Sequence, residues 1–497
     1  MSVALSSKTI NTFGGLTSFP RYDRSKISPG ILHIGVGNFH RAHMSVYMDS
    51  LFNMGLGQDW GIVGAGIQPG DEKMRSNLEK QDWLTTIVEL DPSGLSARVT
   101  GAMVDFLPVD IEAILVGLTD PRIRIVSMTI TEGGYFIDAA TGGLDIEHPD
   151  IRKDASHPDE PQTLFGMIIR ALRVRRERSI PPFTVVSCDN LPGNGHVARQ
   201  TVVGLARLSD AEFADWIEAE VAFPNCMVDC ITPATTARER SIVREQFGIE
   251  DTAPVVCEPF HQWVIEDTFP NGRPPLEEVG VEFVSDVTVY ELMKLRILNA
   301  GHASTCYAAA LLGYHFVHDA LADEDIREWV RALQIRESIP TLGSIEGVDY
   351  SQYLAKVVER FSNPEIGDTI PRNIADGSDR QPKFILPTLR DALDQSGSID
   401  GLALEIALWC RYCTGVMENG DKVIIQDPIA DTLTAQAEEA KTHPKAFIEI
   451  GTVFGDLVDS QKFVSAFGNW YSKLLENGVR QTLKDYVAMG SSAELSS

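Results

Sequence analysis

Four side chains that can transfer protons or donate hydrogen bonds lie within one short stretch, VYELMKLRILNAGH, at residues 289–302. On an α-helix with about 100° per residue, Glu291 and His302 fall roughly 60° and 80° from Lys294. Asn299 follows at roughly 140°, so all four groups share one arc of the helix. An amine, a carboxylate, an imidazole and an amide on one face could carry out acid–base chemistry in a cleft. For an isolated helix, a lysine whose stem is buried and whose head reaches solvent is the commoner arrangement.

The same stretch contains a spacing that points to a different class of enzyme. Tyr290 and Lys294 form Y-x-x-x-K, the catalytic spacing of short-chain dehydrogenases. Those enzymes carry the pair within the nucleotide domain, soon after the fourth strand, and their glycine turn is G-x-x-x-G-x-G. Here the pair lies at the start of a second predicted domain, so we reject the short-chain assignment.

Two predicted strands end in polar residues, at the position where open α/β sheets bind their ligands. SMTITEGGY places Thr131 and Glu132 at one strand end, and VVSCDNLPGNG places Asn190 at another. Such residues also form ordinary turns, but Asn190 comes at the very end of its strand, which favours a functional role. Cys188 has His196 in the same loop as a possible base, yet nothing orients that pair, which argues against a thiol nucleophile.

A glycine turn, ILHIGVGNFHRAH, follows the first predicted strand and precedes a helix. Gly35 and Gly37 would let the backbone approach a pyrophosphate, and the next helix would offer free N–H groups. His40 replaces the third glycine of G-x-G-x-x-G, so the motif alone is equally compatible with a plain turn. Arg41 could add a phosphate partner. We expect cofactor contacts from Ile34, Gly35, Val36, Gly37, Asn38, Phe39, His40 and Arg41, and from Thr131 and Glu132.

An acid follows the second predicted strand, GIVGAGI, at residues 61–67. Asp71 can accept both hydrogen bonds from an adenosine ribose diol, and its charge would repel a 2′-phosphate. Glu72 is the alternative acceptor for the ribose. Without the preceding strand and glycine turn, either acid would be interpreted as a solvated loop residue. The order strand, glycine turn, helix, strand and acid predicts a nicotinamide cofactor, NAD rather than NADP.

The predicted elements that position these residues change from mixed strands and helices to mainly helices near residue 285. Before it, apolar runs without alternation are separated by helical segments, which is typical of a parallel sheet covered on both faces. After it, helical periodicity prevails. We predict an α/β fold with a Rossmann-type doubly wound N-terminal domain at 1–285, a mainly α-helical substrate and catalytic domain at 286–490, and a disordered tail at 491–497.

The composition narrows the class of protein. Against 43 Lys and Arg there are 70 Asp and Glu, and the net charge of −27 argues against nucleic-acid and anionic-membrane partners. The seven scattered cysteines suit reduced thiols in a cytosol. The pairs Cys226/Cys230 and Cys410/Cys413 lack further ligands at zinc spacing, so we expect no metal. Neither a signal peptide nor a membrane-spanning stretch is apparent, and we expect a cytoplasmic protein.

Motifs spread over nearly the whole chain resemble one family, the polyol-specific long-chain dehydrogenases, or mannitol dehydrogenase family. They are HIGVGNFHRAH, QDWLTTIVEL, SMTITEGGY, SCDNLPGNG, FPNCMVDCITP, VVCEPFHQWVIED, NGRPP, KLRILNAGH and RFSNPEI, and together in this order they are highly specific. The resemblance implies a zinc-independent enzyme that interconverts D-mannitol and D-fructose with NAD(H). Relatives that act on arabinitol or sorbitol, or that reduce fructuronate or tagaturonate, remain as alternatives.

The resemblance also implies individual roles. Lys294 of K-x4-N-x2-H would be the general base, and Asn190 and Asn299 would be the oxyanion-hole amides. Glu291 would help to exchange protons with solvent. The implied substrate contacts are Asn190, Asp229, His302 and Arg372, and the implied cofactor acid is Asp71.

A protein of another class, a non-catalytic NAD-binding sensor, would need only the glycine turn and Asp71. The joint presence of Lys294, Asn190 and Asn299 argues against it. We expect a small-molecule polyol or ketose as the partner, and a monomer or small homo-oligomer as the assembly.

Overall fold

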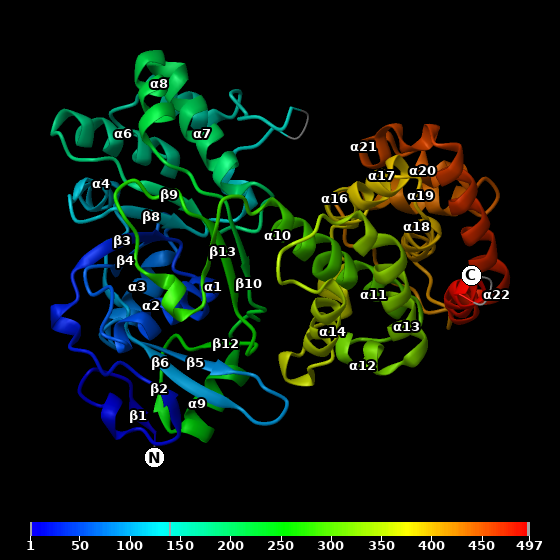
Figure 1. Ribbon diagram of the computed structural model, residues 1–497, viewed down its shortest axis with the longest axis horizontal. Coiled ribbons are helices and arrows are strands. Elements are labelled where there is room, and N and C mark those ends of the chain that lie inside the picture. The colour runs from blue at the N-terminus through cyan, green and yellow to red at the C-terminus, as the bar shows by residue number, and fades with distance from the viewer. Residues whose placement is uncertain (1, 139–140, 495–497) are drawn as a thin grey trace. The chain divides into compact units, whose positions relative to one another are not determined.

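The computed structural model describes residues 2–138 and 141–494 of the 497-residue chain, with side chains described up to Met489. The chain forms two compact units, unit 1 from Met1 to Thr288 and unit 2 from Val289 to Ser497. The division lies close to the predicted boundary at 285/286. Figure 1 shows the sheets of unit 1 and the helices of unit 2.

A five-stranded parallel sheet is the main sheet of unit 1 (Figure 1). Its order is β7 (Met103–Phe106), β4 (Gly61–Ala65), β3 (Pro29–Ile34), β8 (Ile125–Met128) and β9 (Thr184–Ser187), with parallel pairing throughout. From β3 the chain builds outward through β4 to β7, and then adds β8 and β9 on the other side. The strand order therefore reverses between β3 and β8, where doubly wound folds bind their ligands.

Both faces of this sheet are buried, because successive strand residues point to opposite sides. Leu32 and Ile34 pack into an apolar cluster on one face, and Ile31 packs into a second cluster on the other. The helices that contribute include α4 (Ile111–Thr119), α6 (Leu164–Glu177) and α7 (Asn194–Ser209) in the first cluster and α2 (Met44–Asn53) in the second. Strands covered on both sides need no polar alternation. The predicted doubly wound α/β fold is confirmed.

Among the described residues, three smaller sheets complete unit 1. They are β10 (Cys226–Asp229), β13 (Gln262–Glu266) and β14 (Glu282–Val284); β12 (Val255–Cys257), β5 (Thr85–Glu89), β6 (Ser96–Thr100) and β2 (Leu16–Ser18); and β1 (Val3–Ala4) with β11 (Ile249–Glu250). The other helices are α1 (Asn38–Ala42), α3 (Asp71–Glu79), α5 (Pro149–Ser156), α8 (Ala211–Glu220) and α9 (Ala237–Phe247). A break at His43 separates α1 from α2, so the helix after the glycine turn is short.

Unit 2 is mainly helical, as predicted. Its first helix is α10 (Thr288–Met293), which starts at the last residue of unit 1, and a π-helical turn (Lys294–Asn299) and α11 (Ala300–Leu311) follow. The further helices are α12 (Val317–Ala322), α13 (Glu324–Leu333), α14 (Tyr350–Phe361), α15 (Ile370–Ile374), α16 (Gly377–Phe384), α17 (Leu386–Asp394), α18 (Asp400–Cys413), α19 (Ala430–Ala440), α20 (Lys445–Ile448), α21 (Gly451–Phe454) and α22 (Gln461–Glu494).

The core of unit 2 is built around α18, which packs against α22, α19 and α11. α18 is buried along nearly its whole length, which explains why the segment LALEIALWC is almost entirely apolar. α22 breaks at Gly478, where φ is 76°. The predicted disordered tail is helical over 491–494, and residues 495–497 lie outside the described part of the chain. No helix within the described residues combines the length and the apolarity needed to cross a membrane.

Candidate active site

The stretch that contains Lys294 is not one regular α-helix. Residues Lys294–Asn299 form a π-helical turn between α10 and α11. A π-turn bonds residue i to residue i+5, and such turns are frequent at functional sites. The expected angle of about 140° between Lys294 and Asn299 assumed α-helical spacing and is therefore wrong. In the π-turn the two residues are one i, i+5 repeat apart, which brings their side chains closer to a common direction.

The cations of this turn lie on different sides of the helix. Lys294 and Asn299 are half-buried. Arg296 is buried, donates to the carbonyl and hydroxyl oxygens of Thr341, and pairs with Asp391. The arginine is thus fixed within unit 2, away from the arc that carries the lysine and the amide.

The side-chain amide of Asn299 has an unmet hydrogen-bonding requirement. Its Nδ2 atom is buried, and no described residue accepts a hydrogen bond from it. A buried donor without a partner typically costs about 1–3 kcal/mol. Such groups in native proteins call for an explanation, and a ligand that supplies the acceptor is one. Glu291, one α-helical turn before Lys294, is also half-buried.

His302, Asp368 and Arg372 form a connected group in unit 2. The buried His302 ring stacks on Phe361, with 3.6 Å between ring centroids, and its Nε2 atom lies 3.4 Å from Oδ2 of Asp368. Oδ1 of Asp368 accepts hydrogen bonds from Nε (3.0 Å) and Nη2 (2.7 Å) of Arg372. Burial lowers the pKa of His302 despite the nearby carboxylate. Burial alone would raise the pKa of Asp368, but His302 and Arg372 hold it well below its usual range.

The two glycines of the turn after β3 have different surroundings. Gly35 has a φ of 90°, and a Cβ there would lie 2.1 Å from the Thr129 carbonyl oxygen, so a side chain is excluded. At Gly37, which is exposed, a Cβ would lie 3.9 Å from the nearest non-adjacent atom, the Gly35 carbonyl oxygen. The backbone at Gly37 is therefore open to the close approach of a pyrophosphate.

Two turn residues that were expected to contact the cofactor point into the protein. Arg41 is buried and donates to the Gly37 carbonyl (3.2 Å) and to Oδ1 of Asn38 (2.8 Å). His40 is buried with its ring stacked on that of His33, at 3.5 Å between centroids, and burial lowers its pKa well below the usual value. The contacts of Arg41 and His40 support the turn from within, and they do not favour direct binding of a phosphate.

His33, the last residue but one of β3, is a supporting residue that sequence reasoning missed. Its Nδ1 atom lies 2.8 Å from Oγ of Ser127 and its Nε2 atom 3.2 Å from the Gly35 carbonyl oxygen. Burial lowers its pKa to about 3, so it is neutral. A histidine inside an apolar strand just before a glycine turn was the available signal. Of the other expected cofactor contacts, Ile34 and Val36 are buried, Asn38 and Phe39 are half-buried, and Thr131 and Glu132 are exposed.

Asp71 folds back over the end of β4. It opens helix α3, and its Oδ2 atom accepts a hydrogen bond from the Gln68 amide at 2.9 Å. A Cβ on Gly66 would lie 2.3 Å from Cβ of Asp71, so this approach requires glycine at 66. Glu72 is exposed and pairs with Arg75 at 3.1 Å. The geometry favours Asp71 over Glu72 as the acid that meets a ribose.

Asp189 joins the polar ends of β8 and β9. Its carboxylate accepts hydrogen bonds from the amides of Ile130 (3.0 Å) and Thr131 (2.8 Å) and from the hydroxyl of Tyr135 (2.6 Å). Burial raises its pKa against the effect of these donors. Thr131 has a φ of 65°, which is unfavourable for a β-branched residue, and Asp189 holds it there. Asn190 follows directly and is exposed.

The remaining strand-end candidates differ in their surroundings. Asp229 ends β10 and is buried. Cys188 is also buried, and the neighbouring Cys226 thiol together with burial raises its pKa well above the usual value. His196 lies against the side chain of Asn225. A neutral thiol without a histidine partner among the described residues agrees with our rejection of a cysteine nucleophile.

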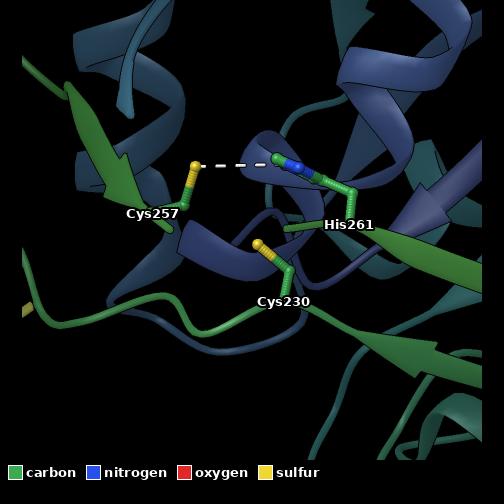
Figure 2. Close-up of side chains that lie close together, drawn as sticks. All are labelled: Cys230, Cys257 and His261. Atoms are coloured by element: carbon green, nitrogen blue, oxygen red, sulfur yellow. Dashed lines mark hydrogen bonds between the residues drawn. The ribbon is translucent and has the colours of Figure 1, made fainter. Parts of the chain in front are cut away.

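Three potential metal ligands lie close together in unit 1 (Figure 2): Cys230 directly follows β10, Cys257 ends β12, and His261 lies in the turn after β12. Their potential ligand atoms are within 4.8 Å of one another. However, Nε2 of His261 lies 3.0 Å from the Ala42 carbonyl oxygen and Nδ1 lies 3.1 Å from that of Pro259. Carbonyl oxygens only accept, so both contacts are satisfied when the ring carries two protons. Burial lowers the His261 pKa, but Cys230 and the two carbonyls raise it to about 9. An imidazolium is no metal ligand, and the absence of a metal stays a prediction.

Family models match both units of the chain. The mannitol dehydrogenase Rossmann domain matches residues 29–278, and the mannitol dehydrogenase C-terminal domain matches residues 286–475. The first match contains the glycine turn, Asp71 and Asn190, and the second contains the π-turn and Arg372.

Relatives and solved structures agree with these matches. Mannitol 2-dehydrogenase of Cereibacter sphaeroides is 50% identical over 471 residues, which are 94% of this chain and 98% of that protein. The ternary complex of Pseudomonas fluorescens mannitol 2-dehydrogenase with NAD and D-mannitol is 41% identical, with a TM-score of 0.86 over 98% of this chain and 100% of that one. Substrate-free D-sorbitol dehydrogenase is 37% identical, with a TM-score of 0.89 over 96% and 100% of the two chains.

Proposed function

The chain belongs to the mannitol dehydrogenase family, and from that premise we propose that it interconverts D-mannitol and D-fructose. It is a polyol dehydrogenase with NAD as its cofactor. The observation that carries the proposal is the π-turn. In it, Lys294 lies one i, i+5 repeat before Asn299, and the buried Nδ2 atom of Asn299 has no acceptor among the described residues. Oxidation of an alcohol needs such a pair, because a base removes the proton while a donor stabilises the charge that develops on oxygen.

The residues of unit 1 fit the cofactor. The open backbone at Gly37 would receive the pyrophosphate, and the carboxylate of Asp71 would accept hydrogen bonds from the ribose diol. The same carboxylate would repel a 2′-phosphate, which favours NAD over NADP. Thr131 and Glu132, exposed beyond β8, would make further contacts. When bound, the cofactor accepts the hydride in oxidation and donates it in reduction.

Lys294 is the general base in oxidation and the general acid in reduction. Its amine removes the proton of the reacting hydroxyl, and in the reverse direction its ammonium returns that proton to the carbonyl oxygen. Glu291 lies one α-helical turn earlier on α10 and is half-buried. We assign it the exchange of protons between Lys294 and solvent.

Asn299 and Asn190 are the donors to the reacting oxygen. The loss of one donor of this kind typically costs about 3 kcal/mol of barrier. Two amides and a lysine ammonium polarise a ketone without a Lewis acid, so we propose that the reaction needs no metal. The other hydroxyls of the substrate would be bound by Asp229, His302 and Arg372.

A panel of ketoses tests the assignment. The oxidation of NADH is followed with D-fructose, fructuronate, tagaturonate, xylulose and sorbose. The highest kcat/KM with D-fructose is expected. A higher value with another ketose would assign the chain to a sister activity. If none of the five ketoses is turned over while NADH still binds, the chain would instead be a non-catalytic NAD-binding protein.

The second candidate is the oxidation of sorbitol, which the TM-score of 0.89 with D-sorbitol dehydrogenase favours. Mannitol and sorbitol differ only in the configuration of one carbinol carbon. A comparison of NAD reduction with D-mannitol and with D-sorbitol separates the two candidates. Arabinitol is the control polyol of different length.

We further propose a cytoplasmic enzyme that is a monomer or a small homo-oligomer. All seven cysteines are buried and unpaired, which suits a reducing compartment. Light scattering of the purified chain would give its assembly directly.

A further inference from the structure

We propose that Asp368 sets the substrate class of the site by favouring neutral, hydroxyl-bearing substrates over substrates with a carboxylate. The inference rests on the proposed function, because it concerns the part of the substrate that His302 and Arg372 would contact. Asp368 follows RFSNPEI in the sequence and was not among the residues expected to act.

The carboxylate of Asp368 has a fixed position in unit 2. The Val317 amide donates to the Asp368 carbonyl oxygen at 3.0 Å and so anchors the backbone. Oδ1 accepts the two hydrogen bonds from Arg372 and a third from Nδ2 of Asn373 at 3.0 Å. Because three hydrogen-bond donors already contact Oδ1, Oδ2 is the oxygen of Asp368 that is left to bind a substrate.

Oδ2 of Asp368 and Nε2 of His302 face each other without a completed hydrogen bond. They lie 3.4 Å apart, both side chains are only 9% exposed, and neither atom has a hydrogen-bond partner of good geometry among the described residues. A hydroxyl group can donate to the carboxylate oxygen and accept from an Nε2–H at the same time. A carboxylate can only accept, so it could not satisfy Oδ2. The two unsatisfied atoms therefore match an alcohol.

The charge of Arg372 is already compensated in this arrangement. Its side chain is 64% exposed, yet Nε and Nη2 both donate to Asp368. His302 and Arg372 keep the pKa of Asp368 well below its usual range against the effect of burial, so the carboxylate is ionised at neutral pH. A substrate carboxylate at this position would lie next to a buried negative charge, and the Arg372 cation beside it is already paired with that charge. Removal of that charge would release Arg372 to attract an acid.

The test is a comparison of two substrates in one variant. Asp368→Asn preserves the shape of the side chain and removes its charge. For the wild-type enzyme and this variant, kcat/KM is measured with NADH and either D-fructose or D-fructuronate. We expect the ratio of fructuronate to fructose to rise at least about tenfold in the variant, equivalent to ~1.4 kcal/mol of discrimination. Within one enzyme the ratio does not depend on the folded fraction, because both constants scale with it equally.

Glu438→Gln is the matched control. Glu438 on α19 also pairs with a nearby cation, Lys441, which directly follows that helix, at 2.7 Å, but it is exposed. The Glu438→Gln substitution should leave the ratio of kcat/KM with fructuronate to kcat/KM with fructose unchanged. Should turnover by Asp368→Asn be too slow to measure, calorimetric dissociation constants of both ligands for the NADH-loaded wild type and variant give the corresponding preference in binding, which should shift in the same direction.

The outcomes separate the inference from the proposed function. Equal losses with both substrates, at an unchanged ratio, would make Asp368 a merely structural residue and overturn the inference. A wild-type enzyme that reduces no neutral ketose would instead overturn the proposed function.

Discussion

Asn299 and Asn194 are two asparagines whose buried amide nitrogens have different surroundings. Nδ2 of Asn194 donates to the carbonyl of Asp189, which follows β9, at 3.1 Å and to that of Cys226, at the start of β10, at 2.8 Å. Nδ2 of Asn299 has no described acceptor. At the scale of the residue, the first amide contributes to the fold, and the second is free to contribute to chemistry.

This contrast predicts opposite effects of two similar substitutions. Asn299→Ala should lower kcat by about 100-fold, for one lost donor of ~3 kcal/mol, with little change in the free energy of unfolding. Asn194→Ala should lower the free energy of unfolding by about 1–3 kcal/mol, because it leaves buried groups unpaired. Urea unfolding and steady-state kinetics measure both quantities. A destabilisation by Asn299→Ala as large as that by Asn194→Ala would show that its amide is structural.

Lys294 is predicted to act on the chemical step alone. Lys294→Ala should reduce kcat by about 100- to 10,000-fold, the usual contribution of a general acid or base. The dissociation constant of NADH, measured by fluorescence, should stay within twofold or so of the wild-type value. Lys356→Ala is the control, because Lys356 is a half-exposed lysine that pairs with Glu359 on α14. An unimpaired kcat would exclude Lys294 as the base.

Asp71 and Glu72 are adjacent acids with different predicted effects on cofactor choice. Asp71→Ala should lower the ratio of kcat/KM with NAD to that with NADP by at least about tenfold, because the ribose diol loses its acceptor and a 2′-phosphate is no longer repelled. Glu72→Ala removes the same charge from a side chain that pairs with Arg75, and should leave the ratio unchanged. The reverse result would assign the ribose to Glu72.

At the scale of elements, the glycine turn combines one glycine that the fold requires with one that the cofactor requires. Gly35→Ala forces a Cβ against the Thr129 carbonyl at a φ of 90° and should lower the free energy of unfolding of unit 1. The backbone conformation alone typically costs about 1–2 kcal/mol. Gly37→Ala meets no such obstacle and should fold normally, but it should weaken NADH binding. Unfolding curves and NADH titrations of both variants test this, and a loss of stability in Gly37→Ala would contradict it.

The sequence was most informative about regular elements. The helical periodicity predicted after residue 285 agrees with helices such as α14 and α18, because a long apolar face has a clear period. The π-turn at 294–299 was not predicted, because one extra residue within a single turn hardly changes the spacing of the apolar residues. The inward direction of Arg41 depends on the Ala253 carbonyl, more than 200 residues away, which no local pattern shows. Asp368 could have been found as an acid four residues before Arg372, the spacing of a helical ion pair.

At the scale of the whole molecule, unit 2 contains a buried acid that the proposed mechanism does not use. Glu405 lies in α18, where it accepts one hydrogen bond from Gln381 at 2.7 Å. Its other oxygen, Oε2, has no partner among the described residues. Burial raises its pKa from the usual 4.5 to about 8. The carboxyl is therefore protonated in the folded protein at neutral pH.

This acid makes stability fall as the pH rises. Between pH 4.5 and about 8 the unfolded chain has released the proton and the folded chain still holds it, so a rising pH favours unfolding; above about 8 the effect is constant. From pH 6 to pH 9 the wild-type free energy of unfolding should fall by about 2–3 kcal/mol on this account. Glu405→Gln should remove that part of the slope, and the exposed Glu438→Gln should retain it. Parallel slopes in urea unfolding of all three proteins would contradict the assignment.

Counted in residues, the π-turn is a single insertion into what would otherwise be one helix from Thr288 to Leu311. The wider turn absorbs its extra residue locally, so α10 and α11 keep the phase of one continuous helix on either side of it. If the same residues were wound as ordinary α-helix, α11 would rotate by about 100° relative to α10. Every residue of α11 is buried, so that rotation would disrupt the packing of the whole unit. The packing of α11 therefore holds 294–299 in the π-helical form and, with it, the spacing of Lys294 and Asn299.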